Sequence, residues 1–376
     1  MRTTQGEKWC SPAGNARPGD IIEIANKGEM PVVVFDFGGG QYPFPDSEVM
    51  RLTTKRVSGI RVRAKILREI RNYFEEQDFL EVEPPTLVRA PGLEINIKAV
   101  RAGRGYLITS PEYSMKRLLA GGLERIFTTA RVFRSEEEGK QHSVEFTMLE
   151  WYRAWATLDD IVSDTEQIVG RAVNAVRGRC SVRVDMREVD LSPPWKRLTV
   201  SEAFNRWAGF GLIGYESPEA LRQKMTRNGI DPGQAVHWDD LFYICFVDRI
   251  QPGLATLNHA VLLTEWPIAL AALARCKPEA PEWALRFEAY VGGVELANAF
   301  DELTDATEQH ARFEREQLMR QERNLEVYPI DPRFMSALHE GLPPSAGIAL
   351  GVDRLAMLAA GASELRTVSA FVGDEL

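Results

Sequence analysis

Two apolar stretches joined by a highly charged connection constrain the fold of this chain most strongly. Residues 132–134 and 145–153 have the apolar and aromatic density of two buried strands, and the segment between them, "SEEEGKQHSV", holds three successive glutamates, a lysine and a histidine. A hairpin turn needs only two to five residues rich in Gly, Asn or Asp, so turn geometry does not explain this connection. A solvated loop is the simplest explanation of its charges.

The composition is that of a globular protein with one large or two medium domains. The chain has 376 residues, of which 44% are apolar and 26% charged. Its four cysteines form no CxxC pair, which predicts a reducing compartment and no structural zinc. The N-terminus lacks the apolar core of a signal peptide, and the most apolar run is broken by Glu265 and Pro267. We therefore expect a cytoplasmic protein with no membrane partner, and its formal charge of −9 argues against broad nucleic-acid binding.

The sequence pattern changes near residue 58 and predicts two parts. Residues 1–57 form an extension rich in Gly and Pro, with a strand at "MPVVVFDF" and too few apolar residues for a core of its own. From Ser58 apolar residues recur every three to four positions, which predicts a helix over 58–78 with Ser58 as its N-cap. "FLEVEPP" then predicts a strand at the edge or end of a sheet. The second part is a domain over 58–376 with a less regular inserted region at about 180–283.

The rest of the chain alternates between strands and helices. We expect a strand ending in "YLITSPE", helices at "YSMKRLLAGG" and 158–178, and, in the inserted region, helical "SEAFNRWA" and "PEALRQKM" with a strand near "TLNHAVLLT". A hairpin follows around Gly292 and Gly293, then a helix with Asp305 and Glu308 as a capping box, then a glycine-bearing strand that turns into a helix. Because several strands are joined by hairpins, this pattern predicts an α+β fold, an antiparallel sheet flanked by helices.

Three groups of residues are candidates for chemistry. The first contains Arg134, Glu136, His142 and Phe146. Arginine offers a planar fork of donors for phosphate oxygens, and an aromatic ring offers a stacking face for a base, so this group suits a nucleotide. Taken singly, an exposed ion pair explains Arg134 and core packing explains Phe146.

The second group lies in "FEAYVGGVELANAFDEL". Glu288 and Glu295 are on opposite arms of the expected hairpin, where two carboxylates repel each other unless a hard cation such as Mg²⁺ lies between them. Asn298 and Glu302 follow on the second arm. Glu302 is an odd number of residues from Glu295, so a bend is needed to bring both to one site. Solvent-facing strand positions are the alternative explanation.

The third group is "GIALGVDR". Gly347 and Gly351 leave room for a ligand near the backbone, and Arg354 at the start of the next helix supplies a cation. Alone this pattern is weak, because glycines also serve turns.

Together the three groups resemble, in order, the signature motifs of class II aminoacyl-tRNA synthetases. Motif 1 corresponds to the helix at 58–78 and the strand that ends at Pro85; motif 2 is the opening stretch; motif 3 ends at Asp353 and Arg354. "SPEYSMKRLL", "EFTMLEWYR" and "VELANAFDELTD" resemble the lysine branch, and most closely the elongation factor P lysine ligases, which attach (R)-β-lysine to a lysine of that translation factor. The similarity runs from about residue 58 to 372.

The resemblance implies a two-part site on a class II synthetase-like sheet. Arg134 and Arg354 would be catalytic, acting on the α- and γ-phosphates, and Phe146 would stack under the adenine. The implied ATP contacts are Arg134, Ser135, Glu136, His142, Ser143, Phe146, Glu295, Leu296, Gly351 and Arg354. Glu288 and Glu295 would hold Mg²⁺. Lysine or (R)-β-lysine would contact Ser110, Glu112, Glu150, Tyr152, Asn298, Glu302 and Ala349.

The implied reaction forms an aminoacyl-adenylate and transfers the acyl group to a lysine of elongation factor P. Motif 1 implies a homodimer, and residues 1–57 are too few for a dedicated anticodon-binding domain. A compact lysyl-tRNA synthetase that acylates tRNA or a small molecule is the first alternative, and a non-catalytic regulator is the second. Ser135 and Ser143 stand where the family commonly has Asn, and Ala299 where it has Gly. Ala349 agrees with the elongation factor P enzymes, since lysyl-tRNA synthetases have Gly there.

Overall fold

The computed structural model describes residues 54–214 and 216–371, together with four short strands near the N-terminus. These strands are β1 (Arg2–Thr3), β2 (Gly6–Glu7), β3 (Ile22–Lys27) and β4 (Met30–Asp36). The strand expected at "MPVVVFDF" is confirmed as β4, which pairs antiparallel with β3. Cys10 and the Gly- and Pro-rich stretches at 11–20 and 37–46 lie outside the described residues.

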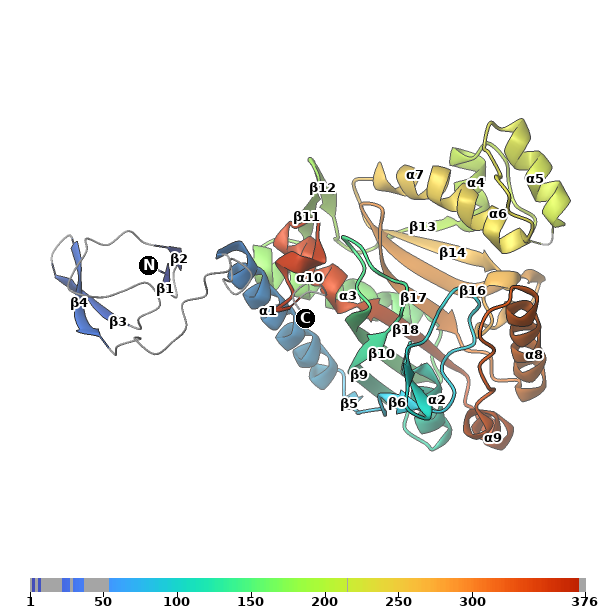
Figure 1. Cartoon of the computed structure of the whole chain (residues 1–376), viewed down its shortest axis with the longest axis horizontal. Helices are drawn as coiled ribbons and strands as arrows, with labels where there is room; N and C mark the ends of the chain where they lie inside the picture. Colours follow the sequence, from blue (N-terminus) through green and yellow to red (C-terminus); the bar gives the residue numbers. More distant parts are fainter. Residues whose placement is uncertain are drawn as a thin grey trace.

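A nine-stranded sheet forms the centre of the molecule (Figure 1). Its strands run in the order β13-β14-β16-β17-β18-β10-β9-β5, with β15 beside β16. Their bounds are β13 Lys196–Thr199, β14 Val261–Pro267, β15 Cys276–Lys277, β16 Ala280–Val291, β17 Val294–Asp301, β18 Ser345–Gly351, β10 Glu145–Ala154, β9 Arg125–Phe133 and β5 Leu80–Glu81. Among the described strands, only β13–β14 and β5–β9 pair in parallel. The α+β class with a mostly antiparallel sheet is confirmed, and β5 lies at the edge as expected for "FLEVEPP".

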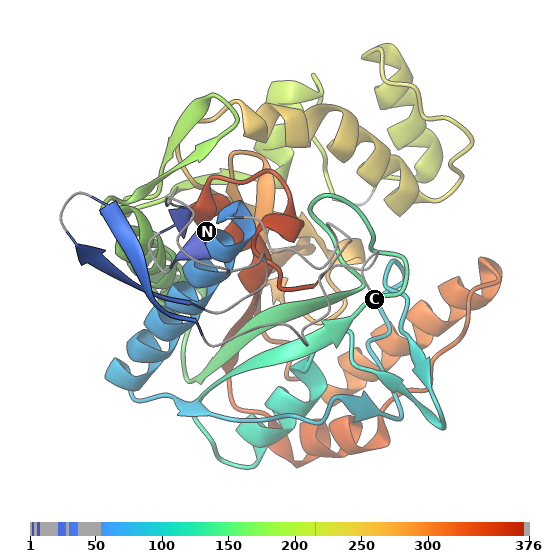
Figure 2. The ribbon, with the colours of Figure 1, turned by 60° about the vertical axis from the view of Figure 1, so that its left-hand side comes forward.

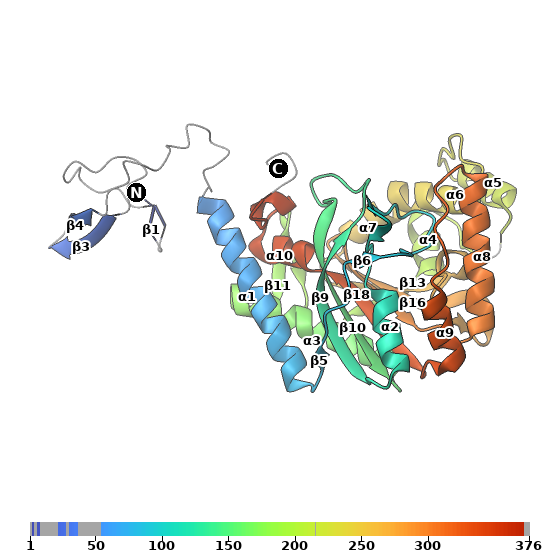
Figure 3. The ribbon, with the colours of Figure 1, turned by 60° about the horizontal axis from the view of Figure 1, so that its bottom comes forward.

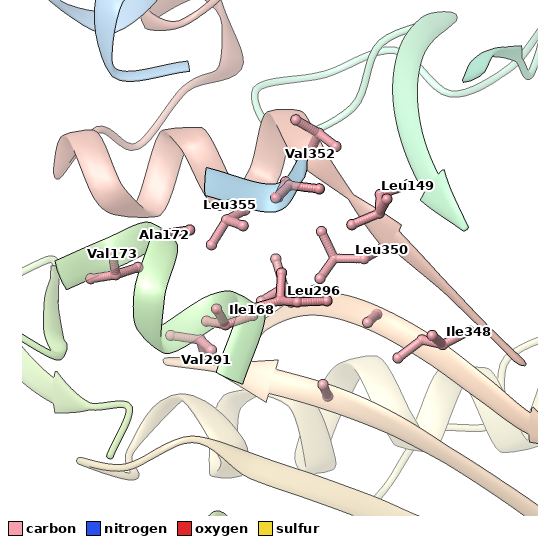
Figure 4. Packing of buried hydrophobic residues seen from close by; sticks show 14 of the residues in the cluster. Leu149, Ile168, Ala172, Val173, Val291, Leu296, Ile348, Leu350, Val352 and Leu355 are labelled. Carbon is pink, nitrogen blue, oxygen red and sulfur yellow. The ribbon is translucent and has the colours of Figure 1, made fainter. Parts of the chain in front are cut away.

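Three helices cover one face of this sheet. They are α1 (Thr54–Glu76), α3 (Leu158–Arg177) and α10 (Val352–Ala360), and Figure 2 shows α1 beside α10. Apolar side chains from alternate strand positions, such as Leu149, Leu296 and Leu350, meet residues of α3 and α10 in a closed core (Figure 4). Burying one such side chain stabilises the folded state by about 1.5–3 kcal/mol. The packing of these helices therefore fixes the position of the sheet.

The opposite face is bordered by helices at its margin and by the inserted region. On one side lie α2 (Glu112–Ala120), α8 (Ala306–Glu322) and α9 (Pro332–Gly341), visible across the sheet from α1 in Figure 3. A small sheet of β6 (Leu87–Val88), β7 (Arg101–Ala102) and β8 (Gly105–Leu107) precedes α2. The short helix η4 (Leu365–Thr367), which contacts α1, is the last described helix.

The inserted region begins with the hairpin of β11 (Ser181–Val184) and β12 (Arg187–Asp190). Its helices are α4 (Val200–Trp207), α5 (Pro218–Arg227), α6 (Trp238–Cys245), η2 (Phe246–Ile250) and α7 (Gln251–Ala255), followed after β14 by η3 (Ile268–Leu270). The two helical patches and the strand expected here are confirmed as α4, α5 and β14. The region has an apolar cluster of its own, in which Phe204, Phe242 and Trp266 are fully buried.

Two sequence predictions about helix ends are wrong. Helix α1 begins at Thr54, so Ser58 lies inside it and is not an N-cap; the Arg56 guanidinium bonds the carbonyls of Ser369 and Ala370, and this tertiary contact accompanies the longer helix. The capping box at α8 is only half formed. Asp305 accepts a hydrogen bond from the Glu308 backbone N–H, but the Glu308 carboxylate pairs with Arg312 at 2.5 Å.

Neither a membrane-crossing helix nor a disulfide is found in the described part of the chain. None of its helices combines the length and apolar character that a membrane span requires. The three cysteines in this part, Cys180, Cys245 and Cys276, are free thiols.

Candidate active site

Strand register places the predicted site residues in one row across four strands. Glu150 of β10 is opposite Ala349 of β18, Ala349 is opposite Asn298 of β17, and Asn298 is opposite Glu288 of β16. Directly opposed residues point to the same face of a sheet. All four side chains therefore point away from the face that α1, α3 and α10 cover.

A β-bulge in β17 supplies the bend that the spacing of Glu295 and Glu302 requires. Tyr290 pairs with Glu295, whereas the preceding Ala289 pairs with Ala297, so Leu296 is the extra residue. The insertion changes the strand's alternation and turns Glu295 to the same face as Asn298. Leu296 itself is buried in the core on the other face, so the implied contact of Leu296 with ATP is restricted to its backbone.

A cavity of about 380 Å³ lies on this face. Its walls include all seven residues expected to bind the amino acid, namely Ser110, Glu112, Glu150, Tyr152, Asn298, Glu302 and Ala349. Arg134 lines the same cavity, so the expected phosphate-binding and amino-acid-binding groups adjoin one another. Gly347 also lines the cavity. A larger residue does not fit at this position, because a Cβ there would lie 2.3 Å from the Tyr152 ring and 2.6 Å from Glu302 Oε1.

Glu150 is a buried carboxylate of the cavity whose two oxygens both accept hydrogen bonds. It is 1% exposed, accepts a hydrogen bond of 2.5 Å from Ser110 Oγ, and accepts one of 2.9 Å from the Tyr152 hydroxyl. Burial, and then the charge of Glu112, raise the pKa of Glu150 to about 8. A cationic ligand beside Glu150 would favour its charged form.

Lys116, which was not predicted from the sequence, is a fully buried cation beside the cavity. Its Nζ lies 2.5 Å from Glu112 Oε1 and 2.6 Å from Glu302 Oε2. Although burial lowers the pKa of Lys116, the two carboxylates raise it above its ordinary value. The i, i+4 spacing of Glu112 and Lys116 on α2 was the available signal. One lysine thus balances part of a three-glutamate pocket.

Arg286, which was also not predicted from the sequence, joins two predicted site residues. Its Nη2 lies 2.5 Å from Glu288 Oε1, and its Nε donates to Asn298 Oδ1 at 3.0 Å. The guanidinium stacks 4.3 Å from the Trp266 ring centroid. These contacts hold Arg286 in place and orient the side chains of Glu288 on β16 and Asn298 on β17.

The Arg134 guanidinium lies near the Phe146 ring and keeps one donor available for a ligand. Its guanidinium lies 5.3 Å from the Phe146 ring centroid, and Nη1 donates to Glu137 at 3.0 Å. The ion pair with a neighbouring glutamate, expected as an alternative, does form. Arg134 Nε is nevertheless buried without a hydrogen-bond partner among the described residues, which leaves a donor for a ligand.

The charged loop of motif 2 contacts motif 3 directly. Arg354 Nη2 lies 2.8 Å from His142 Nε2, and Arg354 Nη1 donates to the Glu295 carbonyl at 2.9 Å. Partial desolvation and the Arg354 charge lower the pKa of His142, which favours a neutral imidazole that accepts this bond. Gly351 lies three residues before Arg354, at the end of β18.

Other loop residues are tied to the segment before β7. The Ser135 N–H donates to the Lys98 carbonyl at 2.9 Å, and Glu136 pairs with Lys98 Nζ at 2.5 Å. Ser143 is half-buried in the returning arm of the loop. The loop is thus anchored at both ends while Glu136 remains largely exposed.

Glu288 and Glu295, the two carboxylates expected to hold Mg²⁺, are not directly opposite each other across the hairpin. Glu295 is opposite Tyr290 and not Glu288. Arg286 and the Tyr290 hydroxyl each lie 2.5 Å from one oxygen of Glu288, and burial followed by the Glu295 charge raises its pKa to about 7. No group of three or more metal-binding side chains occurs within 54–214 and 216–371. Two carboxylates fit a Mg²⁺ ion that takes its other ligands from phosphates and water, provided that Glu288 releases one of its contacts.

Comparison with known proteins gives a family match and several relatives. Residues 46–375 match the family described as tRNA synthetases class II (D, K and N). The chain is 34% identical over 316 residues to a lysine-tRNA ligase of Dehalococcoides mccartyi, covering 82% of this chain and 63% of that relative. It is 34% identical over 328 residues to an elongation factor P-(R)-beta-lysine ligase of Haemophilus ducreyi, covering 85% of this chain and 94% of the relative. The chain spans less than two thirds of the lysine-tRNA ligase. With most of its length matched, the chain belongs to the class II tRNA synthetases (D, K and N).

Proposed function

We propose that this enzyme activates lysine or (R)-β-lysine with ATP and transfers the acyl group to a lysine side chain of elongation factor P. The observation that carries the proposal is a glutamate-rich cavity next to Arg134 on one face of the sheet. Glu112, Glu150 and Glu302 suit a substrate with two ammonium groups, because charge-assisted hydrogen bonds to carboxylates are the strong ones.

In the first step the substrate carboxylate attacks the α-phosphorus of ATP, and pyrophosphate leaves. Arg134 and Arg354 stabilise the phosphate charge, and Phe146 stacks on the adenine. Glu288 and Glu295 would hold Mg²⁺, which would supply further neutralisation of the phosphate charge. In the second step the acceptor amine attacks the acyl carbon, AMP leaves, and the amine gives up a proton. Positioning and electrostatics supply the catalysis, and no enzyme nucleophile is needed.

Two features support elongation factor P as acceptor. The relative named for this reaction is aligned over 94% of its own length. Ala349, in the centre of the row between Glu150 and Asn298, is the residue that the resemblance associates with the elongation factor P enzymes. We propose that residues 58–376 form the catalytic domain with an insertion at about 180–283, that residues 1–57 are an extension, and that the reaction occurs in the cytoplasm.

An acceptor assay tests this function. Pyrophosphate exchange into ATP is measured with lysine, (R)-β-lysine and related amino acids, and acyl transfer is then measured with elongation factor P or tRNA. Exchange with a lysine isomer and transfer to the protein support the proposal. Transfer to tRNA alone favours the second candidate, a lysyl-tRNA synthetase-like ligase, which the equal identity of 34% to a lysine-tRNA ligase supports. Absence of exchange with every amino acid would favour a non-catalytic regulator.

We also propose a homodimer paired through α1 and β5. The proposal rests on the motif 1 resemblance and on the position of β5 at the sheet edge. Light scattering at micromolar concentration is expected to give twice the monomer mass of 42.3 kDa, and a monomer mass contradicts the pairing.

A further inference from the structure

Two carboxylates outside the predicted set face the same cavity. Glu94 lies in the segment before β7, and Glu316 lies on α8; both line the cavity. Across residues 54–214 and 216–371, no hydrogen-bond partner reaches the buried oxygens Glu94 Oε2 and Glu316 Oε2. Glu316 is only 8% exposed. Buried polar atoms in proteins are almost always paired, so these two oxygens in one cavity are available to accept hydrogen bonds from a ligand.

Helix α8 holds Glu94 in place. Arg320, one turn after Glu316, is 2% exposed and donates from Nη1 to the Glu94 carbonyl at 2.9 Å and from Nε to the Glu326 carbonyl at 2.7 Å. Its guanidinium also lies 4.1 Å from the Tyr328 ring centroid. The same helix therefore fixes the backbone of Glu94 and presents the Glu316 carboxylate beside it.

The carboxylates interact unfavourably with one another. Burial and the charge of Glu112 raise the pKa of Glu94, and burial and the charge of Glu94 raise the pKa of Glu316 to about 7. Three cations act in the opposite direction, Lys116 and Arg134 on Glu94 and Arg320 on Glu316. Lys116 already lies between Glu112 and Glu302, Arg134 pairs with Glu137, and Arg320 donates to main-chain carbonyls. A cationic ligand would relieve this repulsion.

The location of Glu94 and Glu316 in the cavity determines which amino group of the substrate they contact. Phe146 and Tyr152 are six residues apart on β10, about 20 Å at the rise of a strand, so the adenine end and the Tyr152 end of the site are well separated. Glu150, Tyr152 and Glu302 form the group at the far end. Three charged side chains act on Glu94, namely Glu112, Lys116 and Arg134. Lys116 also pairs with Glu302, whereas Arg134 is on the proposed phosphate side, so Glu94 adjoins the phosphate side as well as the Glu112–Lys116 pair.

We propose that Glu94, backed by Glu316, binds the amino group of the substrate that lies nearest to its carboxylate, the α-amine of lysine or the β-amine of (R)-β-lysine. Three N–H donors of that ammonium group match the free oxygens of Glu94 and Glu316 together with Glu112. This role rests on the proposed function, and it adds a specificity-determining residue to the first step.

The test compares substrates that lack one amino group. In pyrophosphate exchange, Glu94→Gln is expected to raise KM about tenfold or more for lysine or (R)-β-lysine, because a hydrogen bond between charged groups is lost. Norleucine, which keeps only the amine next to the carboxylate, should show a similar ratio of variant to wild type. For 6-aminohexanoic acid, which lacks that amine, the ratio should stay near one. Glu322→Gln, an exposed charge lining the same cavity, is the control and should leave all three ratios near one.

Other outcomes overturn the proposal. An equal loss with all three substrates means that Glu94 only supports the fold. Normal exchange with slowed acyl transfer means that Glu94 contacts the acceptor amine instead. Should Glu94→Gln not fold, Glu316→Gln provides the same comparison with a smaller expected effect. Activity of the wild type tests the proposed function separately; if it is absent, calorimetric titration with lysine and 6-aminohexanoic acid still tests whether the pair discriminates between them.

Discussion

Asp353 accepts a hydrogen bond of 2.7 Å from the backbone N–H of Thr147, and so joins the first turn of α10 to β10. Its other oxygen accepts from Arg63 Nε of α1 at 3.0 Å, and Arg63 Nη2 bonds the Thr147 hydroxyl at 2.6 Å. One buried carboxylate thus holds all three motifs together. It lies next to Arg354, whose guanidinium reaches the motif 2 loop.

Removal of this link is expected to destabilise the fold. Asp353→Ala removes the acceptor of Arg63 Nε and of the buried Thr147 N–H, so the free energy of unfolding should fall by about 3 kcal/mol. Urea denaturation monitored by fluorescence measures the change. Glu81→Ala removes the exposed pair with Arg71 of the same helix α1 and should cost less than about 1 kcal/mol. Equal losses in the two variants would show that the Asp353 link has no special weight.

Arg134 and Arg354, the two arginines proposed to bind the phosphates, are expected to be essential for adenylate formation. Arg134→Ala and Arg354→Ala each remove a charge-assisted contact worth roughly 3 kcal/mol in the transition state, about a hundredfold or more in the exchange rate. Arg131→Ala is the matched control, because Arg131 lies on β9 and forms an exposed ion pair with Glu145. Wild-type exchange in either phosphate-site variant would contradict the assignment.

Ala349 is expected to select between the lysine isomers. Its methyl group lies on the cavity face between Glu150 and Asn298, where an α-amine and a β-amine occupy different space. Ala349→Gly should shift kcat/KM toward α-lysine by about ten- to two-hundredfold and leave the KM for ATP unchanged. Ala346→Gly, on the opposite face of β18, controls for glycine in a strand. An unchanged isomer ratio would place the selectivity elsewhere.

Glu150 makes stability and substrate binding depend on pH in opposite directions. With a pKa of about 8 in the folded state, this carboxyl keeps a proton that the unfolded chain releases near its ordinary value of 4.5. The free energy of unfolding without ligand should therefore fall as pH rises through this window. Lysine binding needs the charged carboxylate, so KM should fall as pH rises toward 8.

Measurements at several pH values check this prediction. Urea denaturation and exchange kinetics between pH 5.5 and 8.5 are compared for the wild type, Glu150→Gln and the exposed control Glu145→Gln. Glu150→Gln should weaken both pH dependences, although Glu302, whose pKa burial also raises to about 8, retains a share. A wild-type protein that becomes more stable from pH 5.5 to 8 would contradict the direction.

Much of the fold was predictable because its signals are local. The helix α3, the strands around the charged loop, the hairpin at Gly292 and Gly293, and the turn from β18 into α10 follow from periodicity and turn chemistry within about twenty residues. The motif order then identified the candidate site. The helix start at Thr54 was missed because contacts with residues distant in sequence accompany it.

The site itself was decided by tertiary structure. Sequence spacing named Glu150, Ala349, Asn298 and Glu288 as separate candidates, but only the pairing of β10, β18, β17 and β16 puts them in one row. Spacing required a bend in β17, and only the register located it at Leu296. Lys116, Arg286 and Glu94 carry ordinary charged side chains in the sequence. They matter here because burial removes water from them, and burial is set by strands and helices that are far apart along the chain.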